Sequence, residues 1–230
     1  AALIRAMAAA GRKPAVVLEM VPQGLQDELD AFLAGDPPDA AALGERLDWE
    51  ARGWPDWSIY RPIAEAALDN GLPIVAGDLD RARSRAIGRG EEAFEPAADY
   101  AGVSLDNLAE KLRVAHCDLL PDEAIDPMIR VQQARDASMA DAMLAHGDPD
   151  GAVLIAGAGH ARTDWGVPVI LKAKAPDKTT VSIGMIEVTA GDTTMADYTE
   201  NGGFPHDFVV FTPRSDFTDH CAELKERMGK

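Results

Sequence analysis

The sequence predicts an α/β fold with a central, largely parallel or mixed β-sheet flanked by helices. Three short apolar runs support this prediction, because strands covered on both faces are apolar along their whole length. The runs cover residues 15–21, 73–76 and 152–156, and stretches with apolar residues at helical spacing lie between them. Such alternation of strand and helix is typical of parallel sheets. Two later strands, expected over residues 180–188 and 207–212, follow with fewer helices and favour a sheet of mixed direction.

Helices are expected where glycine or proline closes a stretch of helical spacing. One opens the chain, and the others cover residues 23–33, 40–47, 63–70, 81–87, 105–114, 122–144 and 216–228. A chain of 230 residues fits one large domain better than two, so we expect a single domain over residues 1–230. The helical pattern begins at Ala1 without a Met or a capping residue before it. We therefore expect the natural N-terminus, including a first strand, to lie upstream.

The composition argues against several partners. The chain carries 39 Asp and Glu residues against 22 Lys and Arg residues, a net charge of −17. Nucleic acids and anionic membranes are bound by clustered cations, so neither is an expected partner. No apolar run approaches the roughly 18 residues of a membrane span. The two cysteines, Cys117 and Cys221, belong to no zinc or c-type haem motif, and they are either free thiols or one disulfide.

Residues 152–171 contain the first candidate site residue. An apolar run ends in Gly157–His160, which predicts a buried strand that opens into a loop carrying His160. Ligands of open α/β sheets bind at the carboxyl ends of the strands, where His160 is expected. The alternative is an imidazole that only completes an ordinary turn. Glu19, the carboxylate within the run 15–21, is also expected near the end of its strand.

The long helix expected over residues 122–144 contributes further polar candidates. At about 100° per residue, its apolar residues form one stripe with Gln132 and Asp136 in the middle and Arg135 on the flank. Buried polar groups cost stability unless they have partners. Gln132 and Asp136 either bond to one another, or Arg135 and Asp136 point at the strand ends. Out-of-pattern polar groups on three separate segments favour the second interpretation, a polar crevice.

Much of the aromatic bulk lies in one segment that contains Trp49, Trp54, Trp57 and Tyr60. This segment is either a packed corner or a wall for a flat apolar ligand. The sequence contains no GxSxG, HExxH or Walker-type motif, so none of these site classes is indicated.

Together these segments resemble the ChaN-like haem-binding lipoproteins, within a wider group that includes the Tiki/TraB proteins and the erythromycin esterases. The order Arg-Asp-Ala-x-Met-Ala, Gly-x-Gly-His and Gly-Val-Pro is the most specific part of the resemblance. The matching stretches run almost from end to end of the chain: VVLEMVPQ, GWPDWSIYRPI, GLPIVAGDL, AHCDLLP, QQARDASMA, VLIAGAGHARTDWGVP and FVVFTPRSDFTDHC.

The resemblance implies an exported bacterial protein, periplasmic or lipid-anchored to the outer membrane, that serves haem or iron uptake and binds haem through a tyrosine in a homodimer. In the wider group's polar site, a glutamate and a Gly-x-x-His motif correspond to Glu19 and Gly157–His160. The group's upstream Gly-Glu-x-x-His motif lies outside the sequence. The family's GNGH is GAGH here, Asp78 stands where Asn is expected, and Asp219-His220-Cys221 replaces Asp-Pro-Cys. Because export favours disulfides, the resemblance also implies a bond between Cys117 and Cys221.

Haem binding is the function that the resemblance favours. Trp54 and Trp57 would form the apolar wall, and Tyr60 would be the axial ligand, with His160 as a further candidate.

The alternative is a protease- or esterase-like hydrolase, acid–base or dependent on a divalent metal. Glu19 and His160 would then serve as ligand or base, and Arg135 would clamp an oxyanion or a carboxylate beside Asp136. A third interpretation is an interaction module whose polar crevice satisfies only itself.

Overall fold

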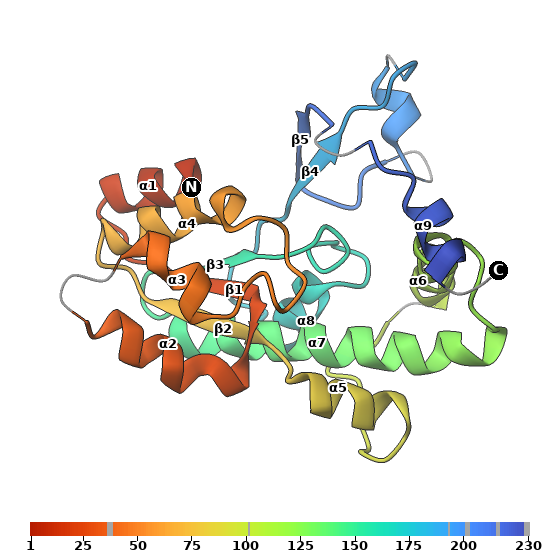
Figure 1. Ribbon diagram of the computed structural model, residues 1–230, viewed down its shortest axis with the longest axis horizontal. Coiled ribbons are helices and arrows are strands. Elements are labelled where there is room, and N and C mark those ends of the chain that lie inside the picture. The colour runs from red at the N-terminus through yellow and green to blue at the C-terminus, as the bar shows by residue number, and fades with distance from the viewer. Residues whose placement is uncertain (36–38, 101, 193, 201–202, 215–216, 228–230) are drawn as a thin grey trace. The chain divides into compact units, whose positions relative to one another are not determined.

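The computed structural model describes residues 1–35, 39–100, 102–192, 194–200, 203–214 and 217–227 (Figure 1). Its elements, with η for 3-10 helices, follow in the order α1 (Ala2–Ala9), β1 (Ala15–Pro22), η1 (Gln23–Leu25), α2 (Gln26–Leu33), α3 (Ala40–Arg46), α4 (Trp57–Leu68), β2 (Ile74–Asp78), α5 (Arg81–Gly88), α6 (Gly102–Ala115), η2 (Asp122–Ala124), α7 (Ile125–His146), β3 (Ala152–Ile155), α8 (Val167–Lys174), β4 (Ile183–Glu187), η3 (Met195–Tyr198), β5 (Phe208–Thr212) and α9 (His220–Arg227). The predicted α/β class is confirmed.

The predicted helices form, with shifted ends. The largest shift concerns α4, which begins at Trp57, six residues before the expected start. The Asp56 side chain explains it, because it accepts a hydrogen bond of 2.8 Å from the Ser58 backbone N–H and caps the helix. The helix then continues through Pro62. The expected helix 216–228 extends beyond the described residues at both ends, and its described part is α9.

Two compact units make up the chain. The first comprises residues 1–84 and 137–156, and the second comprises residues 85–136 and 157–230. The single domain over residues 1–230 stays a prediction.

The first unit is built on a sheet with the order β2-β1-β3, in which both pairings are parallel. Val16 and Leu18 of the central strand pack into the apolar layer formed with α1 to α4 (Figure 1). Ala15 and Val17 face the other side, where they pack with Ala142 of α7. Because both faces of β1 are covered, its sequence is apolar along its length, as the prediction assumed.

The second unit contains a separate sheet in which β4 and β5 pair in parallel. Every pairing between the described strands is therefore parallel, which agrees with the largely parallel form of the prediction. The disulfide implied by the resemblance is present, with Cys117 after α6 bonded to Cys221 in α9 at 2.01 Å. Among the described helices, none has the length and apolar character that would let it cross a membrane.

Candidate functional site

Glu19 lies at the carboxyl end of β1 and is buried. The pairing of β1 with β2 shifts around it, because Leu18 pairs with Ala76 whereas Pro22 pairs with Asp78. Irregularities of this kind change the direction of side chains and are frequent beside functional sites. The predicted position of Glu19 near a strand end is therefore correct.

Trp49, Trp54, Trp57 and Tyr60 form one cluster in the first unit, which we call the aromatic corner. Ring centroids lie 4.7 Å from Trp49 to Trp57, 4.8 Å from Trp49 to Tyr60 and 6.1 Å from Trp49 to Trp54. Trp49 is 1% exposed, and its indole N–H donates to the Pro55 carbonyl at 2.7 Å. Trp49 is thus a packed core residue. The other three rings are half-buried and retain surface that a ligand could contact.

Trp57 is held in place by two contacts with α3. Its indole N–H donates to the Ala40 carbonyl at 2.8 Å. A Cβ atom on Gly44 would lie only 2.5 Å from Cγ of the Trp57 ring, so the helix backbone lies directly against the indole. The orientation of Trp57 therefore depends on glycine at this position of α3.

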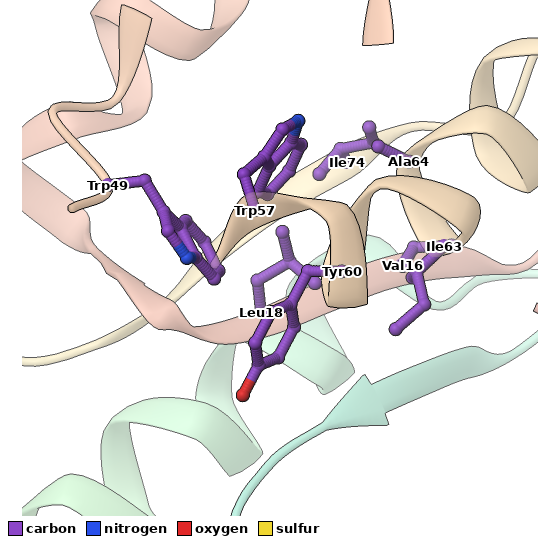
Figure 2. A pocket seen from close by; sticks show the side chains of 8 residues that line it. All are labelled: Val16, Leu18, Trp49, Trp57, Tyr60, Ile63, Ala64 and Ile74. Atoms are coloured by element: carbon purple, nitrogen blue, oxygen red, sulfur yellow. The ribbon is translucent and has the colours of Figure 1, made fainter. Parts of the chain in front are cut away.

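The aromatic corner borders an apolar hollow of about 250 Å³ (Figure 2). Small-molecule sites in proteins commonly enclose about 300–1,000 Å³, so the hollow is too small to enclose a large flat ligand. The Tyr60 hydroxyl is directed away from the indoles of Trp49 and Trp57 in Figure 2. Burial, followed by the negative charge of Glu19, raises the pKa of Tyr60 above its usual value. The lining residues are Val16, Leu18, Trp49, Trp57, Tyr60, Ile63, Ala64 and Ile74.

The second unit contains a buried Asp–His pair. His160 Nδ1 lies 2.6 Å from Oδ1 of Asp136 and 3.0 Å from the side-chain amide of Gln132. His160 is 5% exposed and Asp136 is 0% exposed. The predicted polar positions on α7 are thus the ones that meet His160.

The partners of His160 determine its tautomer. A carboxylate only accepts hydrogen bonds, so the short contact with Asp136 requires a proton on Nδ1. The Gln132 amide then presents its oxygen to that proton, because its NH₂ group would face a second donor. Nε2 of a neutral His160 carries the lone pair, which is the arrangement that orients a histidine as a base or a ligand.

The loop around His160 is held by the backbone. The His160 N–H donates to Gly157 at 2.9 Å, and the His160 carbonyl accepts from Val167 at 2.8 Å. A Cβ atom on Gly166 would lie 2.3 Å from that carbonyl oxygen, so this position requires glycine. The Gly157–His160 and Gly166-Val167 motifs therefore act together as one structural support for the imidazole.

Tyr100 is a residue that the sequence analysis did not select. Its hydroxyl is buried and has no hydrogen-bond partner among the described residues. Burial, followed by the charge of Asp136, raises the pKa of Tyr100. Tyr100 therefore lies near the Asp136–His160 pair, and its position in a presumed loop contained no signal of this proximity.

A second omission is the ion-pair network around Arg162. Its guanidinium lies 2.8 Å from both Asp164 and Glu200, and Lys111 lies 2.6 Å from Glu200. The guanidinium also lies 3.5 Å from the centroid of the Trp165 ring, a cation–π contact. The 38 residues between Arg162 and Glu200 gave no sequence signal for this network, which stabilises the second unit.

The remaining predicted groupings are only partly tested. Arg135 is half-buried on α7 beside Asp136. Glu19 and the aromatic corner belong to the first unit, whereas Arg135, Asp136 and His160 belong to the second. A joint crevice of all these residues therefore stays a prediction. Among the described residues, no three His, Cys, Asp or Glu side chains gather as a metal-ligand set, so the divalent metal of the hydrolase alternative has no support there.

The fold and site define an α/β protein with an aromatic corner beside a parallel sheet and a buried Asp–His pair on a glycine-supported loop. Residues 1–171 match the family described as haem-binding uptake, Tiki superfamily, ChaN. The chain belongs to this family, and the predicted resemblance is confirmed.

Comparison with solved structures agrees on the fold. A structure described as cofacial heme binding to ChaN of Campylobacter jejuni matches 84% of this chain and 74% of its own chain, with a TM-score of 0.67 and 23% sequence identity. The comparison with curated proteins returned no match.

Proposed function

We propose that this ChaN-family protein binds haem against the aromatic corner, with Tyr60 as the axial ligand and Trp54 and Trp57 as the apolar wall, and that it does so as a homodimer in haem uptake. The observation that carries the proposal is the half-buried Tyr60 ring, which packs 4.8 Å from Trp49 while its hydroxyl is directed away from the indoles (Figure 2). A phenolate is an established axial ligand of haem iron.

The hollow supports a ligand that lies against the corner and extends beyond it. With about 250 Å³ it cannot hold a porphyrin, whereas half-buried indoles offer flat apolar surface to one. The fixed Trp57 ring favours binding, because little side-chain freedom is lost when a ligand packs on it. The structural neighbour is described as binding haem cofacially, which is consistent with porphyrin rings that are not enclosed by one chain.

His160 is retained as a further candidate ligand. Its Nδ1–H is committed to Asp136, so its Nε2 has the lone pair that a haem iron requires. Because His160 belongs to the second unit, its participation is tested separately from that of Tyr60.

We also propose that the protein is exported, in the periplasm or anchored to the outer membrane. The support is the Cys117–Cys221 bond, because disulfides persist in oxidising compartments and are rare in the cytosol.

Titration with haemin tests the ligand assignment. We expect a shifted Soret band for the wild type, a clearly changed band or loss of binding for Tyr60→Phe, and weaker binding for Trp54→Ala. Tyr198→Phe is the matched control, because that hydroxyl already accepts from the Thr189 N–H at 2.9 Å. An unshifted wild-type band would refute haem binding, and an unchanged band in Tyr60→Phe would refute Tyr60 as the ligand.

A further inference from the structure

The sheet of β4 and β5 has one face that is both apolar and exposed. Ile183 pairs with Phe208 and Met185 pairs with Val210, and paired residues of neighbouring strands point to the same side. Their exposed fractions are 37% for Ile183, 70% for Met185, 62% for Phe208 and 47% for Val210. We call these four residues the outer face.

The opposite face of this sheet is covered. A Cβ atom on Gly184 would lie 2.5 Å from Cδ2 of His206, so the histidine ring packs directly on the strand. Phe211 contributes ring contacts of 5.2 Å with Tyr198 and 6.2 Å with Phe204. Parallel sheets occur almost only with both faces covered, and two strands alone are marginal in water. The outer face therefore calls for a covering surface.

The area and the charge of the outer face indicate what covers it. With the neighbouring exposed Val181 and Val188, it offers roughly 600 Å² of apolar surface, close to the about 800 Å² per partner of a standard interface. None of these six side chains is charged, whereas the whole chain carries a net charge of −17. Two copies can approach over an uncharged patch without bringing their carboxylates together, and a flat apolar patch is complementary to itself in a two-fold dimer.

We propose that the outer face of β4 and β5 is the surface on which a second copy of this chain docks, face to face. The inference deepens the proposed function, since it assigns a surface to the homodimer proposed there. The interface contains no residue of the aromatic corner, so the dimer forms without haem. A lipid surface is the less favoured occupant, because the patch has no basic residue among its six members to attract anionic headgroups.

Sedimentation velocity of the haem-free protein over a range of concentrations tests the proposal. We expect a monomer–dimer equilibrium in the wild type and at least a tenfold weaker association in Met185→Asp and in Phe208→Asp. Leu3→Asp is the matched control, because Leu3 is a similarly exposed apolar residue on α1, at 49%. A monomeric wild type, or dimers that persist in both variants, would overturn the proposal. Equal weakening by Leu3→Asp would overturn it too, since the effect would then not belong to this face.

A second measurement does not depend on destabilising the fold. Both cysteines of the chain are joined in a disulfide, so Met185→Cys introduces the sole free thiol. We expect slower maleimide labelling of this thiol at concentrations where the protein is dimeric than after dilution. Labelling that is independent of concentration, or protection by neutral vesicles alone, would overturn the proposal. Haemin titration of Met185→Asp keeps the two proposals apart, because loss of the Soret shift in Tyr60→Phe concerns the ligand and not this face.

Discussion

His160 and Asp136 form a fully buried pair in which the imidazole Nδ1 lies 2.6 Å from a carboxylate oxygen. They come from a loop and from the middle of α7, 24 residues apart in the sequence. A carboxylate with 0% exposure is stable only when neighbouring donors replace its water. The pair therefore connects the Gly157–His160 motif to the helix.

Removing the carboxylate should destabilise the protein. We expect Asp136→Ala to lower the free energy of unfolding by about 1–3 kcal/mol, because the buried Nδ1–H of His160 loses its acceptor. Urea denaturation followed by circular dichroism measures the change. The double variant with His160→Ala should lose less than the sum of the two single losses, since each single change removes the same bond. Strictly additive losses would contradict the pairing.

The close approach of α3 to Trp57 predicts that Gly44→Ala destabilises the aromatic corner. The new methyl would lie 2.5 Å from the indole, so the ring or the helix must move, at a cost of about 1–3 kcal/mol. Gly102→Ala is the control, because no atom lies within 4 Å of the position that its Cβ would take. Thermal unfolding and tryptophan fluorescence check both variants. A wild-type melting temperature and emission spectrum for Gly44→Ala would contradict the contact.

Haem affinity should rise with pH. Burial, and then the charge of Glu19, raise the pKa of Tyr60 above its usual value of about 10, so its phenol is protonated at neutral pH. Coordination to iron would release that proton, and the association constant would increase by up to about tenfold per pH unit below the pKa. Soret titrations at several pH values measure this slope. Tyr60→Phe should lack it, and an equal slope in that variant would assign the proton to another group.

The disulfide should contribute strongly to stability. It joins cysteines 104 residues apart, and closing a loop of this length restricts the unfolded chain by about 4–5 kcal/mol in the entropy model. Urea unfolding with and without reductant, compared with the Cys117→Ser, Cys221→Ser double variant, measures this difference. The unfolded, unreduced protein should show no reactive thiols on titration. Two reactive thiols would mean that the bond does not form.

The sequence predicted the elements whose signal is local. β1 was recognisable because both of its faces are buried, and α7 because Gln132 and Asp136 interrupt an apolar stripe. The early start of α4 was missed, because the cap formed by Asp56 precedes the apolar spacing.

The site was predictable only in part, for the same reason. Asp136 and His160 were selected because each breaks an apolar pattern. The proximity of Tyr100 to Asp136, and that of Arg162 to Glu200, depend on tertiary packing between segments that carry no common pattern. The outer face escaped notice because exposed and buried strands have the same apolar composition when read from the sequence.

His206 predicts a loss of stability in acid. Its Nδ1 lies 2.9 Å from the Ser182 hydroxyl, which donates in turn to a backbone carbonyl. Burial, followed by the positive charge of Arg162, lowers the pKa of His206, although Asp164 and Glu200 act in the opposite direction. The folded state thus disfavours the imidazolium, while the unfolded chain takes up a proton near pH 6.5. The resulting stability is present above about pH 6.5 and is lost as the pH falls through the lower folded-state pKa. Urea midpoints between pH 5 and 8 should fall more steeply for the wild type than for His206→Gln. Identical slopes for the two proteins would show that His206 is protonated equally in the folded and the unfolded state.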